Sequence, residues 1–324
     1  MSDSPLLRSP IDYRSRPAAF ADVHEIHRLV AACEHRLHGR ATTDADSIAA
    51  DLGRPGLDLA CDTVLVHDHG GQLAGWAWVR GRRSTVDVHP EHRGRGLGRS
   101  LLDWAEARAR QTGGERLAQT VSDSDRAAAA LLRSRGYSPL VTEWLLEFAM
   151  PDEPDVPEPP EGIVVRPFRP GDGPAVHQLT EDAFDEWQQR RQSYEEWARH
   201  TVERATFEPA ASPIAFADDQ MVGAVLSLNG PDQAEGYVER VAVRHDHRNR
   251  GIARMLLREA FRTFHTHGMR TCTLWTHSDT GALSLYQRIG MTVRRSSTVY
   301  STELTAGTDG DGVGVSPFPA APAE

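Results

Sequence analysis

The stretch YVERVAVRHDHRNRGIARMLL, residues 237–257, joins a strand-like segment to a helix-like segment through a loop rich in arginine. Its first part alternates as a strand, with Val241 and Val243 on one side, and apolar residues at helical spacing follow Gly251. The first turn of a helix presents backbone N–H groups without intrahelical partners and the positive end of the helix dipole. The stretch therefore predicts a cradle for a pyrophosphate, with a solvated turn as the alternative.

The same pattern occurs 155 residues earlier. Thr85–Gly98 reads TVDVHPEHRGRGLG, again a strand, an Arg/Gly loop and the start of an amphipathic helix. Further on, LLRSRGY at 131–137 precedes LYQRIGM at 285–291 by 154 residues. A duplication with so long a period indicates two copies of one domain rather than a solenoid of short repeats.

The order strand, Arg-x-x-Gly-x-Gly/Ala, helix, strand and Leu-Tyr-x-x-x-Gly resembles the GNAT superfamily of acetyl-CoA-dependent N-acyltransferases. The tandem arrangement is similar to that of the mycothiol synthases and their relatives. The resemblance implies an α/β (α+β) fold of two tandem domains, each a mixed, mostly antiparallel central sheet flanked by helices. The expected division is a first domain over 1–150, a linker over 151–162, a second domain over 163–304 and a disordered tail over 305–324.

Three local features refine this division. The linker, PDEPDVPEPPE over 151–161, is dense in proline and acid and predicts an extended spacer between the copies. The segments ending at Met150 and at Glu303 are each expected to close their domain as a pair of strands. A short helix is expected over Thr280–Arg288.

Composition narrows the function. The chain has 324 residues, enough for two domains, with 39% apolar residues and a mean hydropathy of -0.48. It lacks an apolar run of the ~20 residues that a membrane span needs and has no signal-peptide core at its beginning, so a cytoplasmic protein without membrane contact is expected. All 36 basic residues are arginine, which excludes Schiff-base and Walker-loop chemistry. The net charge of -10 argues against a nucleic-acid partner, and three distant cysteines with no metal-binding motif predict no metal site.

The resemblance assigns the catalytic residues in the second copy. Acyl transfer to an amine needs a base for the ammonium proton and an acid for the departing thiolate. The family places its acid at Tyr286, for which the alternative is an aromatic packed under the cofactor helix. Glu239, expected on the same side of the strand as Val241 and Val243, is the candidate base, directly or through water. It could instead pair with Arg240 or face solvent, and the position two residues earlier, which carries the glutamate in mycothiol synthases, is Tyr237 here.

The resemblance also implies the residues that bind acetyl-CoA, the expected co-substrate. The backbone of the central strand would contact the pantetheine arm, and the loop and helix start would wrap the pyrophosphate. Asp279 stands where the family usually has Asn and is either a cofactor contact or the N-cap of the next helix. In the second copy the predicted cofactor contacts are Val241, Ala242, Val243, Arg248, Asn249, Arg250, Gly251, Ile252, Ala253 and Asp279.

The first copy keeps the loop without the chemistry. The repeat offset aligns Tyr286 with Leu132 and Glu239 with Ser84, and leucine cannot donate a proton. The first lobe is therefore interpreted as an acetyl-CoA binder or a structural partner. Its predicted cofactor contacts are Val86, Val88, Arg93, Gly94, Arg95, Gly96, Leu97 and Gly98.

The leading hypothesis is an N-acetyltransferase that acts on a small-molecule amine by direct attack in a ternary complex. The alternatives are acetylation of a protein amine and a non-catalytic acetyl-CoA sensor. A monomer whose lobes form a pseudo-dimer is expected, with a homodimer as the alternative. The acceptor region of the second lobe carries acids beside aromatics, which suits a cationic amine or, equally, core packing; these residues are Phe184, Asp185, Glu186, Trp187, Tyr194 and Trp197.

Overall fold

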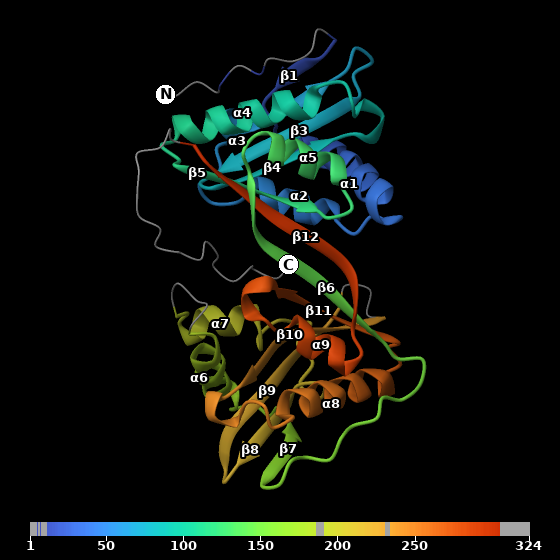
Figure 1. Ribbon diagram of the computed structural model, residues 1–324, viewed down its shortest axis with the longest axis vertical. Helices are drawn as coiled ribbons and strands as arrows, with labels where there is room; N and C mark the ends of the chain where they lie inside the picture. Colours follow the sequence, from blue (N-terminus) through green and yellow to red (C-terminus); the bar gives the residue numbers. More distant parts are fainter. Residues whose placement is uncertain (1–4, 6, 8–11, 186–190, 231–233, 305–324) are drawn as a thin grey trace. The chain divides into compact units, whose positions relative to one another are not determined.

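The chain forms two compact units in the computed structural model, which describes residues 5, 7, 12–185, 191–230 and 234–304 (Figure 1). Unit 1 contains the described residues up to Thr142 together with 296–304, and unit 2 contains Glu143–Arg295. Each unit is a mixed, mostly antiparallel sheet flanked by helices, so the expected fold class is confirmed. The expected tail over 305–324 lies outside the described residues.

Unit 1 is built from a sheet whose helices lie on both faces. In chain order its elements are β1 (Arg14–Arg16), η1 (Phe20–Asp22), α1 (Val23–His38), α2 (Ala45–Leu52), α3 (Leu59–Asp62), β2 (Thr63–His67), β3 (Leu73–Arg80), β4 (Arg83–Val88), η2 (Pro90–His92), α4 (Leu97–Gln111), β5 (Arg116–Ser122) and α5 (Arg126–Ser134). Helix α4 packs on β3, β4 and β5, and α1 packs against β3 and β4 with a separate cluster of apolar side chains.

Unit 2 repeats this order. Its elements are β7 (Ile163–Pro167), α6 (Gly173–Phe184), α7 (Tyr194–His200), β8 (Pro213–Ala217), β9 (Gln220–Asn229), β10 (Glu235–Val243), η3 (His245–His247), α8 (Ile252–Thr266), β11 (Thr271–His277), η4 (Ser278–Thr280) and α9 (Leu283–Ile289). Helix α8 packs on β8, β9 and β10, and α6 packs on β9 and β10 with its own apolar cluster.

Two long strands, β6 (Ser138–Ala149) and β12 (Thr292–Glu303), belong partly to each unit. The strand order is β1-β2-β3-β4-β5-β12 in unit 1 and β6-β11-β10-β9-β8-β7 in unit 2. Residues 297–303 of β12 pair antiparallel with β5, and residues 143–149 of β6 pair antiparallel with β11. Each unit is thus completed by the closing strand of the other copy.

This exchange differs from the expected division in three ways. Residues 143–150, expected in the first domain, lie in unit 2, and 296–304, expected in the second, lie in unit 1. Each segment that was expected to form a closing pair is one uninterrupted strand. Its ladder partner comes from a distant part of the chain, β11 for β6 and β5 for β12. The Pro/acid segment connects β6 to β7 within unit 2, where Val156 packs against the core, rather than spacing the copies.

Glycines let the loop helix of each copy lie close to its sheet. A Cβ at Gly223 on β9 would meet the side chains of Ile252 and Leu256 at 3.0 and 3.1 Å. At the equivalent position of β3, a Cβ at Gly75 would meet Leu101 at 2.9 Å. The first turn of each helix is therefore held against the strand that neighbours the central strand, β10 or β4.

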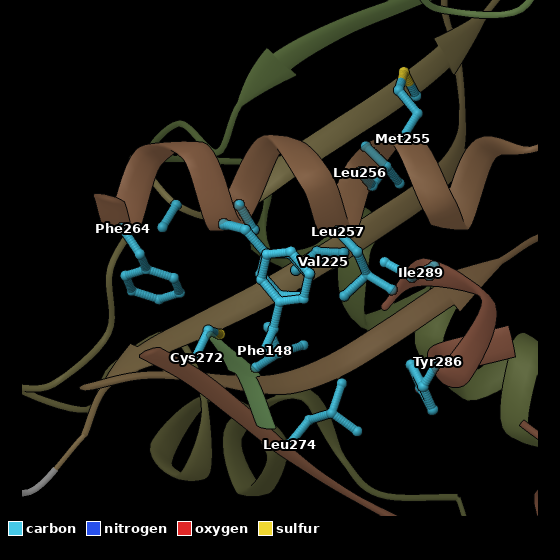
Figure 2. Packing of buried hydrophobic residues seen from close by; sticks show 14 of the residues in the cluster. Phe148, Val225, Met255, Leu256, Leu257, Phe264, Cys272, Leu274, Tyr286 and Ile289 are labelled. Carbon is cyan, nitrogen blue, oxygen red and sulfur yellow. The ribbon is translucent and has the colours of Figure 1, made fainter. Parts of the chain in front are cut away.

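The core beneath α8 fixes this helix in place. Leu256 and Phe264 are fully buried in this core (Figure 2). Phe261 is also fully buried and stacks on Phe148 with ring centroids 4.5 Å apart. Burying each such side chain contributes about 1.5–3 kcal/mol. Residues of β6 thus supply part of the packing that positions the helix start.

Candidate functional site

The central strand of unit 2 has an open edge. Residues 235–237 of β10 pair in parallel with 271–273 of β11, and the pairing then ends although β10 continues to Val243 and β11 to His277. The other edge of β10 stays paired with β9 as far as Val243. Among the described residues, the backbone groups of 238–243 that face β11 have no strand partner. An extended ligand can bind such an edge as an added strand.

The loop after β10 exposes the start of α8. Asn249 and Gly251 adopt left-handed backbone conformations, with φ of 61° and 83°, and a Cβ at Gly251 would meet nothing within 4 Å. The first copy has the same conformations at Gly94 and Gly96, with φ of 77° and 86°. In both copies there is open space beside the glycine that precedes the helix, and the first N–H groups of a helix have no intrahelical partner, so an anion can bind there.

The loop arginines divide into two roles that the sequence did not separate. The Arg248 guanidinium donates hydrogen bonds to the carbonyl oxygens of Val243, at 3.2 Å, and of Ala183, at 3.0 Å. Arg93 in the first copy likewise contacts the Val88 carbonyl and forms a 2.9 Å ion pair with Asp125. These two side chains tie the loop to the protein. Arg250 and Arg95 are exposed and add positive charge to the loop.

The side chains of the remaining predicted cofactor contacts on β10 and α8 are buried or half-buried. Val241 and Val243 are half-buried on the α8 side of β10, and the Ala242 side chain is buried on the α6 side. Ile252 is buried in the core, whereas Ala253 is half-buried on the first turn of α8. In the first copy Leu97 is buried and Gly98 follows it in the first turn of α4.

Tyr286 is carried by α9 at the margin of the core beneath α8, beyond Ile289 (Figure 2). It is 8% exposed, and burial raises the pKa of its phenol to about 12. The phenol is therefore neutral near pH 7 and has a proton to donate. Both predicted roles, an acid and an aromatic of the core, are compatible with this position.

Glu239 occupies a β-bulge that the sequence did not indicate. The register of β10 against β9 shifts between Val238 and Arg240, so Glu239 has no partner in the ladder. Val238 and Val241 both lie in the core beneath α8, which strict alternation would forbid. The expectation that Glu239 lies on the side of Val241 and Val243 assumed unbroken alternation, and the bulge removes its basis.

Charged groups near the ends of α6 and α7 act on Glu239. Its side chain is 8% exposed, and desolvation raises the pKa of its carboxyl, opposed by Arg240, Arg204 and His200. Arg240 lies over the Phe184 ring at the end of α6, and His200 ends α7. The expected pairing with Arg240 is loose, with Oε1 and Nε 4.0 Å apart.

Asp279 does not cap the helix that carries Tyr286. Helix α9 begins at Leu283, three residues later than expected, because Gly281 adopts a left-handed turn with φ of 63°. Its N-cap is Ala282, which forms no side-chain cap, and Asp279 is exposed and accepts a hydrogen bond from Ser278. The cap that was expected there exists in the first copy, where Asp125 accepts from the backbone N–H of Ala128.

The first copy has an open edge but different side chains. Residues 83–84 of β4 pair with β5, and the pairing then ends before Val86 and Val88. Ser84 and Leu132 are both buried. No sequence pattern indicated Asp87. It accepts a 3.1 Å hydrogen bond from the Trp76 indole, and burial raises the pKa of its carboxyl to about 6.

The acceptor region of unit 2 is only partly described. Trp197 is 1% exposed and belongs to the core under α6 and α7, which agrees with the packing alternative. Asp185 is exposed and pairs with Arg191 at 3.1 Å. Glu186 and Trp187 lie outside the described residues.

Two further features of the described residues bear on function. Among them, no three His, Cys, Asp or Glu side chains are grouped so that they could hold a metal ion. None of the helices in the same part of the chain is long and apolar enough to cross a membrane.

Comparison with known proteins agrees with this geometry. The profile of the Acetyltransferase (GNAT) family matches residues 23–137 and, a second time, 174–291. The mycothiol acetyltransferase of Catenulispora acidiphila is 28% identical over 302 residues, covering 86% of this chain and 95% of that protein. The mycothiol acetyltransferase of Streptomyces coelicolor is 27% identical, covering 81% of this chain and 88% of that protein.

Two solved structures are similar to this chain over most of its length. A GCN5-related N-acetyltransferase from Sphaerobacter thermophilus superposes with a TM-score of 0.76 at 30% identity, covering 93% of this chain and 98% of that one. A tandem GNAT protein from the clavulanic acid biosynthesis pathway superposes with a TM-score of 0.67 at 20% identity, covering 92% of this chain and 100% of that one. This second likeness concerns the fold alone.

Proposed function

Because the chain belongs to the acetyltransferase (GNAT) family and is an N-acetyltransferase, we propose that it acetylates a primary amine of a small molecule, with the chemistry in unit 2. Acetyl-CoA supplies the activated thioester. The carrying observation is that the open edge of β10, the exposed start of α8 and the neutral phenol of Tyr286 belong to one unit. Relatives named mycothiol acetyltransferases support an acceptor of small size.

The binding part of the proposal rests on backbone groups. The N–H groups that follow Gly251 would hold the pyrophosphate, and the exposed Arg250 would add positive charge. The unpaired edge over 241–243 would hold the pantetheine arm as an added strand and direct the thioester toward the gap between β10 and β11. Arg248 would act indirectly, since its hydrogen bonds fix the loop.

The proton transfers are assigned to two side chains. Glu239, directly or through water, would take the proton from the ammonium, and the neutral amine nitrogen would then bond to the thioester carbonyl carbon. When the C–S bond breaks, the Tyr286 phenol would give its proton to the thiolate. The nitrogen would then lose its second proton, which returns to the phenolate through water, and a neutral amide remains. The raised pKa of Glu239 makes its carboxylate a better base than an exposed glutamate, and the high pKa of Tyr286 keeps its proton available.

Unit 1 is proposed to lack transfer activity. Ser84 and Leu132 stand where unit 2 has Glu239 and Tyr286, and neither can exchange a proton near pH 7. Its open turn at Gly96 supports binding of a second acetyl-CoA. We propose a monomer in which the two copies form a pseudo-dimer.

The deciding experiment measures thiol release from acetyl-CoA across a panel of primary amines, with mass detection of the acetylated products. We expect turnover of at least one small amine that is lost in Tyr286→Phe. Tight acetyl-CoA binding without release for any small amine would contradict the proposal. That outcome would favour a protein acceptor or a non-catalytic acetyl-CoA sensor.

A further inference from the structure

Two neighbouring side chains at the bulge of β10 each leave a buried polar atom unsatisfied. Glu239 Oε2 and Arg240 Nε are both buried and have no hydrogen-bond partner among the described residues. The side chains are 8% and 22% exposed, and Glu239 Oε1 lies 4.0 Å from Arg240 Nε. A charge-assisted hydrogen bond would bring these atoms to about 2.7–2.9 Å. The two groups therefore do not satisfy each other.

Unsatisfied buried charges require an explanation. Most buried polar groups in native proteins have a partner, and those that do not often face a site filled by water or ligand. Glu239 presents an oxygen that can only accept when ionised, and Arg240 presents a group that can only donate. The complementary ligand carries a cationic donor for one and an anionic acceptor for the other.

The surrounding charge favours an anion in addition to the amine. Besides Arg240, the charged groups that act on Glu239 are Arg204 and His200, both positive when protonated. Tyr237, which experiences the charges of Glu239, Arg240 and Arg204, adds a neutral phenol. The Glu239 carboxylate thus experiences the charges of two guanidinium groups and an imidazole. A simple amine would engage only Glu239 and would leave the buried Nε of Arg240 without an acceptor.

The packing of Arg240 makes it a directional group. Its guanidinium lies 5.9 Å from the centroid of the Phe184 ring, at the end of α6. Its neighbour Glu239 lies in the open edge of β10, just before residues 241–243, which the proposed function assigns to the pantetheine arm. An anion held by Arg240 would therefore orient an attached amine toward Glu239.

We propose that the acceptor is an amine of the α-amino-acid class, whose carboxylate binds Arg240 while its ammonium group faces Glu239. This inference rests on the proposed function and deepens it by naming the substrate class. Arg240 is a specificity residue in this assignment: it binds the part of the acceptor that does not react. The proposed acceptor carries both charges and so differs from the cationic amine that the acidic residues near Phe184 predicted from sequence.

The test compares paired acceptors that differ only in the carboxylate. Thiol release is measured with L-α-amino acids, the amines that remain after decarboxylation and the methyl esters. We expect kcat/KM to favour the carboxylate-bearing member of a pair by about 100-fold. Arg240→Gln should lower this preference at least about tenfold, through KM, and Arg240→Lys should restore part of it. Arg199→Gln, an exposed arginine on α7, should change neither.

The outcomes separate the inference from the proposed function. Turnover of amines without a carboxylate preference, or an equal loss for both members of each pair in Arg240→Gln, would overturn the inference and leave the acetyltransferase assignment standing. Release with no amine at all would overturn both. Retained acetyl-CoA binding and an unchanged thermal midpoint in Arg240→Gln would show that the variant is folded.

Discussion

A buried tyrosine can serve packing, proton transfer or both, and Tyr286→Phe separates these roles. The substitution removes only the hydroxyl and leaves the ring in the core beneath α8. If the phenol protonates the leaving thiolate, kcat should fall by about 10- to 10⁴-fold with little change in the thermal midpoint. Steady-state thiol release measures the effect. Tyr137→Phe, which alters a buried tyrosine of unit 1, is the control; an unchanged rate in Tyr286→Phe would remove the residue from the role of acid.

The burial of Glu239 predicts a pH dependence. A base must be ionised, and desolvation raises the pKa of this carboxyl above its ordinary range. As the pH rises through that pKa, kcat/KM should increase, at a pH well below the ionisation of the amine itself. Glu239→Gln should lower the rate by about 10²–10⁴-fold and lose this acidic limb. If kcat/KM of the Glu239→Gln variant still rose with pH in the same way, the titrating group would be another residue.

Asp87 in unit 1 predicts a pH-dependent stability. Its folded pKa of about 6 exceeds the ordinary value of 3.8, so folding favours the protonated form. The carboxyl therefore does not lower the free energy of unfolding below about pH 4. The destabilisation grows as the pH rises and is complete above about 6. Asp87→Asn keeps an acceptor for the Trp76 indole and should stabilise the protein by about 1–3 kcal/mol at pH 7.5 and hardly at pH 4. Urea unfolding at both pH values checks this; equal differences would contradict it.

At the scale of elements, the exposed helix start gives a matched pair of substitutions. Gly251 and Gly96 both adopt left-handed φ and have open space where a Cβ would lie, so valine should strain both turns similarly. Gly251→Val should raise the KM for acetyl-CoA at least about tenfold, because the side chain would occupy the path of the phosphate. Gly96→Val should leave turnover nearly unchanged. Equal losses of turnover in the two variants would place part of the chemistry in unit 1.

Sequence patterns predicted those elements whose signal is local. The loop between β10 and α8 has a glycine and arginines at fixed spacing, and the duplication repeats that spacing, so the helix start could be located. The bulge at Glu239 could not, because it depends on the register with β9, a property of two strands. The late start of α9 was also missed, because Gly281 forms a turn where a helix would have been compatible with the pattern. The sequence indicated Arg240 only as a partner for Glu239, because the burial of its Nε atom depends on the folded structure.

At the scale of the whole molecule, the exchange of closing strands could not be predicted from sequence, because it also depends on contacts between distant segments. β6 and β12 occupy the same place in the two repeats, and each has the alternation of a sheet strand. Either strand could close either sheet by pattern alone. The pairing of 143–149 with β11 and of 297–303 with β5 is decided by long-range contacts. The boundaries of a folding unit therefore differ from the boundaries of the sequence repeat.

This difference predicts which fragments fold. A fragment of residues 143–295 contains every strand of unit 2, whereas 163–304 ends as the repeat does and lacks the part of β6 that pairs with β11. The 163–304 fragment thereby loses Leu146, which is fully buried, and Phe148, which stacks on Phe261. Loss of a buried leucine or phenylalanine side chain costs about 2–5 kcal/mol each, and the strand's hydrogen bonds are lost as well. That sum is comparable with the total stability of a domain, about 5–15 kcal/mol.

We therefore expect the 143–295 fragment to unfold cooperatively on heating and the 163–304 fragment to lack a transition. Circular dichroism melts of the two fragments, with size-exclusion chromatography to detect aggregates, measure the difference. Adding a synthetic peptide of residues 138–150 to the 163–304 fragment should restore part of the transition, because the peptide supplies the missing strand of the ladder. A cooperative melt of 163–304 at the same midpoint as 143–295 would contradict the assignment of β6 to unit 2, since the strand would then contribute nothing to its core.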